Sequence, residues 1–183
     1  DKGFRRMGSE WKRDTDGRVK LKMYAGGVAG DEPDMLRKMR IGQLNAASIT
    51  VAGLGQIDPA FKIFEIPMFF ESHEELVHVL SEMEPLLKKR LLDKGYVLLH
   101  WGNAGWVHLF SMEPVRTPDD LRKQKLFTWA GDNNMLGWWK ENKFQIVPLA
   151  ATDIPTGLQT GLIEVVPAPP ISALAFQWFR STP

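Results

Sequence analysis

The sequence contains no cysteine among its 183 residues, which excludes a disulfide framework and thiol chemistry. Net charge is also nearly absent, because 23 Lys and Arg stand against 22 Asp and Glu. A chain this balanced has no strong field to attract nucleic acid or an anionic membrane surface. No apolar run approaches the ~20 residues of a membrane span. We expect no signal peptide in this sequence and, since the first residues already have a helical pattern, a mature or trimmed product.

Patterns for catalysis or cofactor binding are missing as well. His73 and His78 are five residues apart, so about 140° separates them around a helix, unlike the zinc-binding pair four apart. His100 and His108 lie on expected strands without a cysteine or carboxylate at ligand spacing. The glycines of GGVAG and GLG complete no phosphate-binding pattern, and no serine stands in a G-x-S-x-G elbow. We therefore expect no metal, no cofactor and no enzymatic activity.

What the sequence does contain is a regular alternation of helical and strand patterns. Helices are predicted from the start to Gly17, at 34–41, 72–83, 85–93, after the TPDD cap at 117–120, at 133–142 and at 153–160. Strands are predicted at 19–24, 45–50, 96–103, 106–111, 126–130, 145–149 and 162–166. Strand–helix–strand units of this length favour an α/β fold with a largely parallel sheet covered by helices.

Aromatic residues stand at the end of one predicted strand. In LFTWA, Phe127 and Trp129 are two residues apart and therefore lie on one face. In an open α/β sheet, ligands bind beyond the carboxyl ends of the strands. The two rings are therefore candidates for a binding cleft. They fit a buried lobe core at least as well, and the residues alone favour the core.

Four blocks of sequence occur in a fixed order: GRVKLKMYAGGVAGDEPDMLRKMRIGQLNAA at 17–47, EIPMFFESHEEL at 65–76, PVRTPDDLRKQKLF at 114–127 and DIPTGLQTGLIEVV at 153–166. Together they resemble the periplasmic solute-binding proteins of TRAP transporters, the DctP type. The resemblance implies a two-lobed α/β periplasmic-binding-protein fold (type II-like), incomplete at both ends, with a family strand before Asp1 and the rest of both lobes after Pro183. It predicts a first lobe over 1–102, a partial second lobe over 103–167 and a return crossing segment over 168–183. We expect a hinge at Gly102–Gly105, although a plain turn explains these glycines equally well.

The same resemblance implies a departure at the binding site. Arginines that pair with an organic acid in the family fall here on Phe127 and Val107, and a family asparagine falls at about Ala168. Because a buried carboxylate without its partner costs ~3–5 kcal/mol, we expect no simple C4-dicarboxylate. An apolar or aromatic solute is predicted instead, with Phe127, Trp129, Val107 and Trp101 as walls. Asn103, Asp132 and Asn133 are predicted to supply orienting hydrogen bonds.

The resulting hypothesis is a secreted or lipid-anchored periplasmic receptor of a TRAP-type uptake transporter. Its expected partners are a small-molecule solute, the membrane permease subunits and, in one branch of the family, a TPR-repeat protein. Two other classes stay open. In a partner-binding interaction protein with a degenerate cleft, Phe127 and Trp129 would be dry core or interface, and an α/β enzyme is disfavoured by the missing catalytic constellation.

Overall fold

The computed structural model describes residues 2–130 and 133–182, with only the backbone for residues 133–135. The chain forms two compact units, Asp1–Gly30 and Asp31–Pro183. In the first unit, helix α1 (Lys2–Asp14) is followed by a segment without regular structure. The helix ends where Asp16 adopts a left-handed φ of 51° and the Gly17 N–H donates to the Lys12 carbonyl at 2.7 Å, which caps the last carbonyls. Because Gly8 has no side chain, Leu21 packs directly on this helix.

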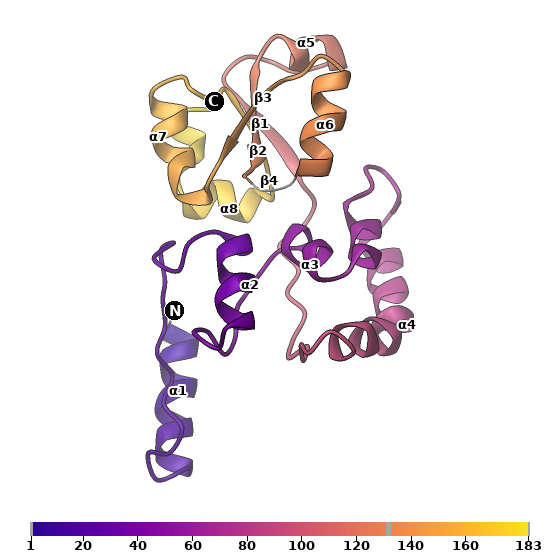
Figure 1. The fold of residues 1–183 in the computed structure, drawn as a ribbon. Helices are drawn as coiled ribbons and strands as arrows, with labels where there is room; N and C mark the ends of the chain where they lie inside the picture. Colours follow the sequence, from indigo (N-terminus) through magenta and orange to yellow (C-terminus); the bar gives the residue numbers. More distant parts are fainter. Residues whose placement is uncertain (1, 131–132, 183) are drawn as a thin grey trace. The chain divides into compact units, whose positions relative to one another are not determined.

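The first half of the second unit is helical (Figure 1). It contains α2 (Glu32–Arg40), α3 (Val51–Ile57), the 3-10 helix η1 (Pro59–Glu65) and α4 (His73–Leu92). These elements share one apolar core of fully or nearly fully buried side chains: Leu36, Ile57, Phe61, Leu87 and Leu91. This group is called the helical core below.

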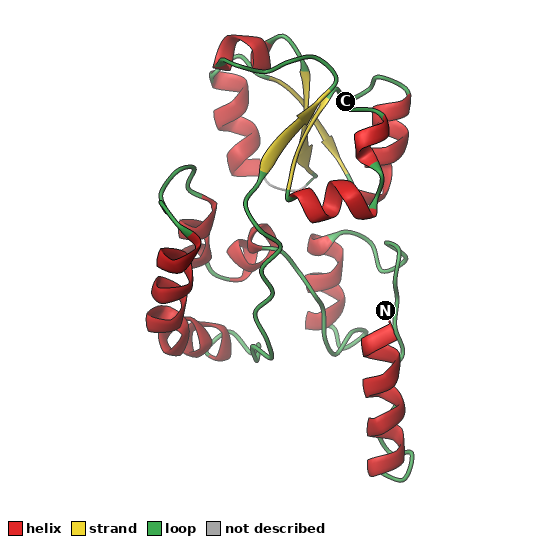
Figure 2. Cartoon of the chain, turned by 180° about the vertical axis from the view of Figure 1, so that it is seen from behind, coloured by secondary structure: helices red, strands yellow, loops and turns green. Residues whose placement is uncertain are grey.

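The second half of that unit is an open four-stranded sheet flanked by helices (Figures 1 and 2). The strands are β1 (His108–Ser111), β2 (Lys125–Trp129), β3 (Gln145–Leu149) and β4 (Val165–Ala168), in the order β1-β4-β2-β3. β2 runs parallel to β3 and β4, whereas β1 is antiparallel to β4. The remaining elements are α5 (Pro118–Arg122), α6 (Asn133–Glu141), η2 (Ala151–Asp153), α7 (Ile154–Gln159), α8 (Pro170–Ala175) and η3 (Trp178–Arg180).

The apolar face of the sheet is covered by α7, α8 and η3. The buried members of this sheet core are Phe127, Ile154, Leu158, Ile163, Val166, Ala168, Ala173 and Trp178. Fully burying a side chain of the Val, Leu, Ile or Phe kind stabilises a fold by ~1.5–3 kcal/mol. The sheet core therefore fixes the position of β2 and of the residues at its end.

Three of the strands predicted from sequence are not strands in this structure. Residues 19–24, 45–50 and 96–103 are extended, but the described residues supply no neighbouring strand for them. In the last of these, Tyr96 and Leu98 pack against the helical core, while Val97 and Leu99 are 71% and 79% exposed. The alternation typical of a strand is thus present, and what is missing is the hydrogen-bonded partner that turns an extended segment into a sheet.

Two helix predictions were also wrong. The two helices expected at 72–83 and 85–93 are a single α4 that contains Pro85. Interior proline costs about 3 kcal/mol, but Leu80, Met83, Leu87 and Leu91 keep a helical spacing across it and pack on the helical core. Residues 51–57, for which no helix was predicted, form α3, which α2 and the helical core hold in place.

Candidate functional site

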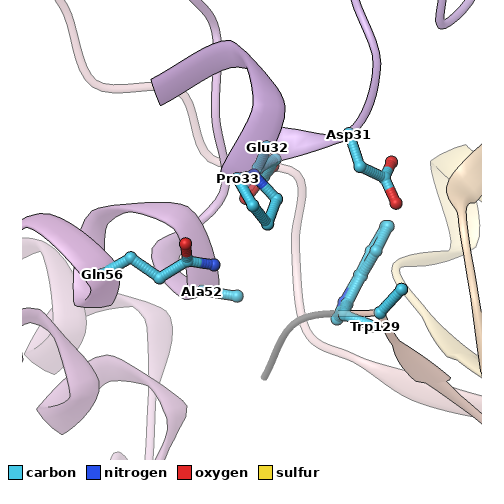
Figure 3. Close-up of a pocket in the computed structure, with 7 residues that line it drawn as sticks. Asp31, Glu32, Pro33, Ala52, Gln56 and Trp129 are labelled. Carbon is cyan, nitrogen blue, oxygen red and sulfur yellow. The ribbon is translucent and has the colours of Figure 1, made fainter. Parts of the chain in front are cut away.

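A small hollow lies where β2 ends, opposite the first turns of α2 and α3 (Figure 3). Trp129 and Ala130 line one side at the carboxyl end of β2, the edge at which open parallel sheets bind ligands. The other lining residues come from the start of α2 and from one face of α3: Asp31, Glu32, Pro33, Ala52 and Gln56. Ala52 and Gln56 are four residues apart and so share that face.

Glu32 builds the wall formed by the two helices. Its carboxylate accepts hydrogen bonds from the Thr50 N–H at 2.7 Å and the Thr50 hydroxyl at 2.9 Å, and also from the Gly53 backbone. Thr50 is the N-cap residue of α3 but makes no capping bond of its own. Glu32, eighteen residues earlier, therefore takes over the capping of α3 and ties α2 to α3.

Gly53 makes this close approach possible. A Cβ atom at position 53 would overlap the Glu32 carboxylate and lie 3.1 Å from the Ile49 Cβ. Burial raises the pKa of Glu32 above its ordinary value, against the lowering effect of its hydrogen bonds to Thr50 and Gly53. The geometry thus keeps a partly desolvated carboxylate beside the hollow.

Asp31 has a different partner. It precedes α2 as the N-cap residue, yet its side chain makes no capping bond. Its Oδ1 instead accepts from the Ala151 N–H at a long 3.4 Å, from the segment that follows β3. Figure 3 shows this carboxylate on the same side of the hollow as Trp129, with Ala52 and Gln56 on the other side.

Trp129 packs against the sheet core. Its ring meets Phe127 edge-on, with the ring centroids 5.1 Å apart, and it is packed against the buried cluster. The Ala130 N–H donates to the Leu149 carbonyl at 3.2 Å, which extends the β2–β3 pairing past the strand. The half-buried indole therefore packs against the sheet core and also borders the hollow.

The hollow has a volume of about 10 Å³, which is room for one water molecule. Its lining combines carboxylate acceptors, the donor and acceptor atoms of one amide, and an aromatic ring. None of the lining residues that the structure describes is a lysine or arginine. Within residues 2–130 and 133–182, no group of three or more His, Asp or Glu side chains is arranged to hold a metal ion, and no helix is long and apolar enough to cross a membrane.

The residues that the sequence predicted for one site lie in different parts of the structure. Phe127 and Ala168 are 3% and 4% exposed and belong to the sheet core, so neither presents an open surface. Trp129 packs against the same core and is the one predicted residue that lines the described hollow. The alternative that Phe127 is buried core, kept open at the sequence level, is the arrangement observed.

The other predictions lie elsewhere. Trp101 packs against the helical core with its ring 6.2 Å from that of Phe61. Asn103 accepts from the Gly105 N–H at 2.7 Å and contacts His73, so its side chain shapes a turn. Val107 is 63% exposed beside β1. Asp132 lies outside the described residues, as does the Asn133 side chain, and their contact with a solute stays a prediction, as does a hinge at Gly102–Gly105.

Sequence reasoning missed the lining residues from the α2–α3 wall, namely Asp31, Glu32, Pro33, Ala52 and Gln56. No helix is predicted from sequence at 51–57, so α3 was missed as well. One signal was present: VAGLGQI is a short apolar stretch directly after a threonine, a good N-cap residue. The two glycines of this stretch argue against a helix because glycine has a low helix propensity. In the structure they are the residues that allow close contact with Glu32 and Lys62.

Known proteins resemble almost the whole chain. The family model of the bacterial extracellular solute-binding protein, family 7 (DctP), matches residues 1–172. A solute-binding protein of Chromohalobacter salexigens is 28% identical over 165 residues, covering 89% of this chain and 49% of the relative. The 2,3-diketo-L-gulonate-binding periplasmic protein of Escherichia coli is 27% identical over 153 residues, covering 82% of this chain and 46% of the relative. The chain thus spans about half the length of these curated relatives.

Solved structures agree on the fold. A TRAP periplasmic solute-binding protein of Sulfitobacter sp. NAS-14.1, with bound β-D-galacturonate, matches with a TM-score of 0.85 at 24% identity, covering 98% of this chain and 60% of that one. Another from Chromohalobacter salexigens, with bound D-glucuronate, matches with a TM-score of 0.76 at 27% identity, covering 91% and 56%. The predicted α/β fold of the two-lobed periplasmic-binding-protein kind is confirmed. The chain belongs to the bacterial extracellular solute-binding protein family 7, the DctP family.

Proposed function

We propose that this chain is the solute-contacting part of an extracytoplasmic receptor for a TRAP-type uptake transporter. The family to which it belongs consists of solute-binding proteins and not of enzymes, in agreement with the prediction that the chain has no catalytic role. The observation that carries the proposal is the hollow at the carboxyl end of β2, lined by an indole, an amide and carboxylates. Membrane permease subunits are the proposed partners, and a TPR-repeat partner stays a prediction.

The proposed solute is a small polyhydroxylated compound of the sugar-acid type. Related structures contain β-D-galacturonate, D-glucuronate, L-gulonate or succinate. The apolar or aromatic solute expected from the sequence lacks support, because Phe127 is enclosed in the sheet core and the hollow is lined by Asp31, Glu32 and Gln56 beside Trp129. A sugar combines hydroxyl groups with an apolar ring face, so it matches an aromatic ring bordered by polar side chains.

The proposed mechanism is closure of the two lobes around the solute. A solute that contacts one conformation better than the other shifts their equilibrium by its differential affinity. Trp129, which packs against the sheet core, is the proposed stacking surface. A pre-fixed ring loses little conformational entropy on binding, which favours affinity.

Thermal unfolding of the chain against a solute panel tests the proposal. The panel holds D-glucuronate, D-galacturonate, L-gulonate and succinate, with benzoate and indole-3-acetate as aromatic acids. A compound present at 100 times its dissociation constant stabilises the folded state by about 2.7 kcal/mol, which raises the melting temperature by roughly 5–10 °C for a chain of this size. We expect this shift from a hydroxylated acid.

Trp129→Ala should remove the shift, while Trp106→Ala, at an exposed tryptophan away from the hollow, should retain it. Stabilisation by no compound would refute the receptor proposal. Stabilisation by the aromatic acids alone would refute the sugar-acid class and restore the apolar one.

A further inference from the structure

The size of the hollow at the end of β2 matches a single small polar group. Its volume of about 10 Å³ holds one water molecule. A whole sugar ring needs far more space, since ligand pockets usually measure ~300–1,000 Å³. Under the proposed function the hollow therefore accommodates only one small group of the solute, and a hydroxyl group, which is similar in size to water, fits it.

The chemistry of the lining matches a hydroxyl group as well. A hydroxyl donates one hydrogen bond and accepts up to two. Asp31 offers carboxylate acceptors, of which Oδ1 has only a long 3.4 Å bond from the Ala151 N–H among the described contacts. Gln56, exposed on α3, offers an amide N–H₂ donor. Both carboxylate oxygens of Glu32 already accept hydrogen bonds from Thr50, so Glu32 has the structural role of holding α2 against α3.

The lining also argues against a carboxylate in this hollow. Among the described residues that line the hollow there is no lysine or arginine, whereas two carry carboxylates. A second anion there would be repelled and left without a partner, which is a costly arrangement in a desolvated site. An acidic solute would thus place its uncharged end here and its acid group elsewhere.

Resting on the proposed function, we propose that this hollow is a subsite for one hydroxyl group of the solute. Asp31 accepts the hydroxyl hydrogen, the Gln56 amide donates to the hydroxyl oxygen, and Trp129 covers the adjoining carbon. Glu32 is the positioning residue, because it ties α3, and with it Gln56, to the start of α2, which carries Asp31.

Isothermal titration of D-glucuronate, D-galacturonate and their monodeoxy derivatives tests the subsite. Loss of the recognised hydroxyl should weaken binding to the wild-type chain about 10- to 100-fold. Gln56→Ala should weaken binding of the parent sugar acid similarly and should no longer discriminate against that one deoxy compound. Gln43→Ala, an exposed glutamine outside the hollow, is the matched control and should bind as the wild type does.

Gln56→Glu tests whether a hydroxyl group or the acid group of the solute lies beside Gln56. The introduced carboxylate offers no donor, and Asp31 already accepts the single hydroxyl hydrogen, so binding of a sugar acid and of its uncharged methyl ester should fall alike, about 10- to 100-fold. A loss that is much larger for the free acid than for its methyl ester would mean that the acid group sits at Gln56 and would overturn the subsite. Gln56→Ala binding like wild type would also overturn it and leave the receptor proposal standing. A wild-type chain that binds succinate but no hydroxylated acid overturns the subsite and the sugar-acid class, and one that binds no panel compound refutes the receptor proposal as well.

Discussion

Replacing Phe127 by arginine distinguishes a ring in the sheet core from a ring in a cleft. The family resemblance places an acid-binding arginine at this position, so a cleft position should accept Phe127→Arg and gain affinity for carboxylates. In the structure the Phe127 side chain is 3% exposed, and its neighbours in the sheet core are all apolar, among them Ile154, Leu158 and Val166. The substitution would therefore bury a guanidinium without a partner.

The expected loss follows from two terms. Removing a buried phenylalanine forfeits ~1.5–3 kcal/mol of apolar burial. An unpaired buried charge costs several kcal/mol more, even after local relaxation. The sum of about 5 kcal/mol or more is comparable with the whole stability of a typical domain, ~5–15 kcal/mol. Phe127→Arg should accordingly unfold the chain or lower its melting temperature by at least ~10 °C.

Urea and thermal unfolding followed by near-ultraviolet circular dichroism measure this effect. Phe179→Arg is the matched control, because Phe179 is 50% exposed and the same substitution there should change stability by less than about 0.5 kcal/mol. Phe127→Leu should cost about 1 kcal/mol, since an apolar side chain still fills most of the space. A Phe127→Arg variant that melts within a degree of wild type and binds succinate would show that the ring faces solvent-accessible space, and the assignment to the core would be wrong.

Two further predictions concern the helical half of the chain. Asp58 is buried, and its Oδ1 accepts hydrogen bonds from the Arg90 Nε at 3.0 Å and Nη2 at 2.8 Å, which lowers the pKa of Asp58. The ionised Asp58 stabilises the folded state fully above the pKa of about 3.9 that it has in the unfolded chain. This contribution is lost as the pH falls through the lower pKa of the folded state, so the free energy of unfolding should drop below about pH 4. Asp58→Asn should destabilise the chain by about 1–3 kcal/mol at pH 7. In urea titrations it should also reduce the decrease of the unfolding free energy below pH 4, and an unchanged decrease would exclude Asp58 as its cause. Gly53→Ala should destabilise the chain by about 1–3 kcal/mol because the new Cβ collides with Glu32, whereas Gly137→Ala, in α6 with open space around it, should stabilise by about 0.5–1 kcal/mol. Equal melting temperatures for these two variants would contradict the close packing at Gly53.

Local sequence signals predicted the elements that depend on neighbours in the chain. The TPDD cap predicts α5, where Thr117 accepts from the Asp120 N–H and Asp120 reaches back to the Thr117 N–H. The apolar runs at 126–130 and 145–149 correspond to the parallel pair β2 and β3. Local signals failed at residues 96–103, because the apolar run YVLLHWGN predicts a fully buried strand but does not show whether another strand pairs with it.

The candidate site depended on distant parts of the chain and could be predicted only in part. Trp129 was identified from its position at the end of a strand. Its companions Asp31 and Gln56 are remote in sequence, and no periodicity links them to β2. Phe127 shows the same limit, since two residues on one face of a strand can both point to a core, and only the packing of α7 and α8 decides that this one does.

By itself, the sequence determined the α/β class, the family and most helices of the sheet half, because capping residues, hydrophobic spacing and ordered motifs are local properties of the chain. Only the tertiary structure decided that α4 continues through Pro85, that Phe127 is enclosed and that Asp31, Gln56 and Trp129 border one hollow. The physical reason is that burial and the meeting of distant side chains are set by how elements pack against one another, and the free energy of that packing outweighs local preference.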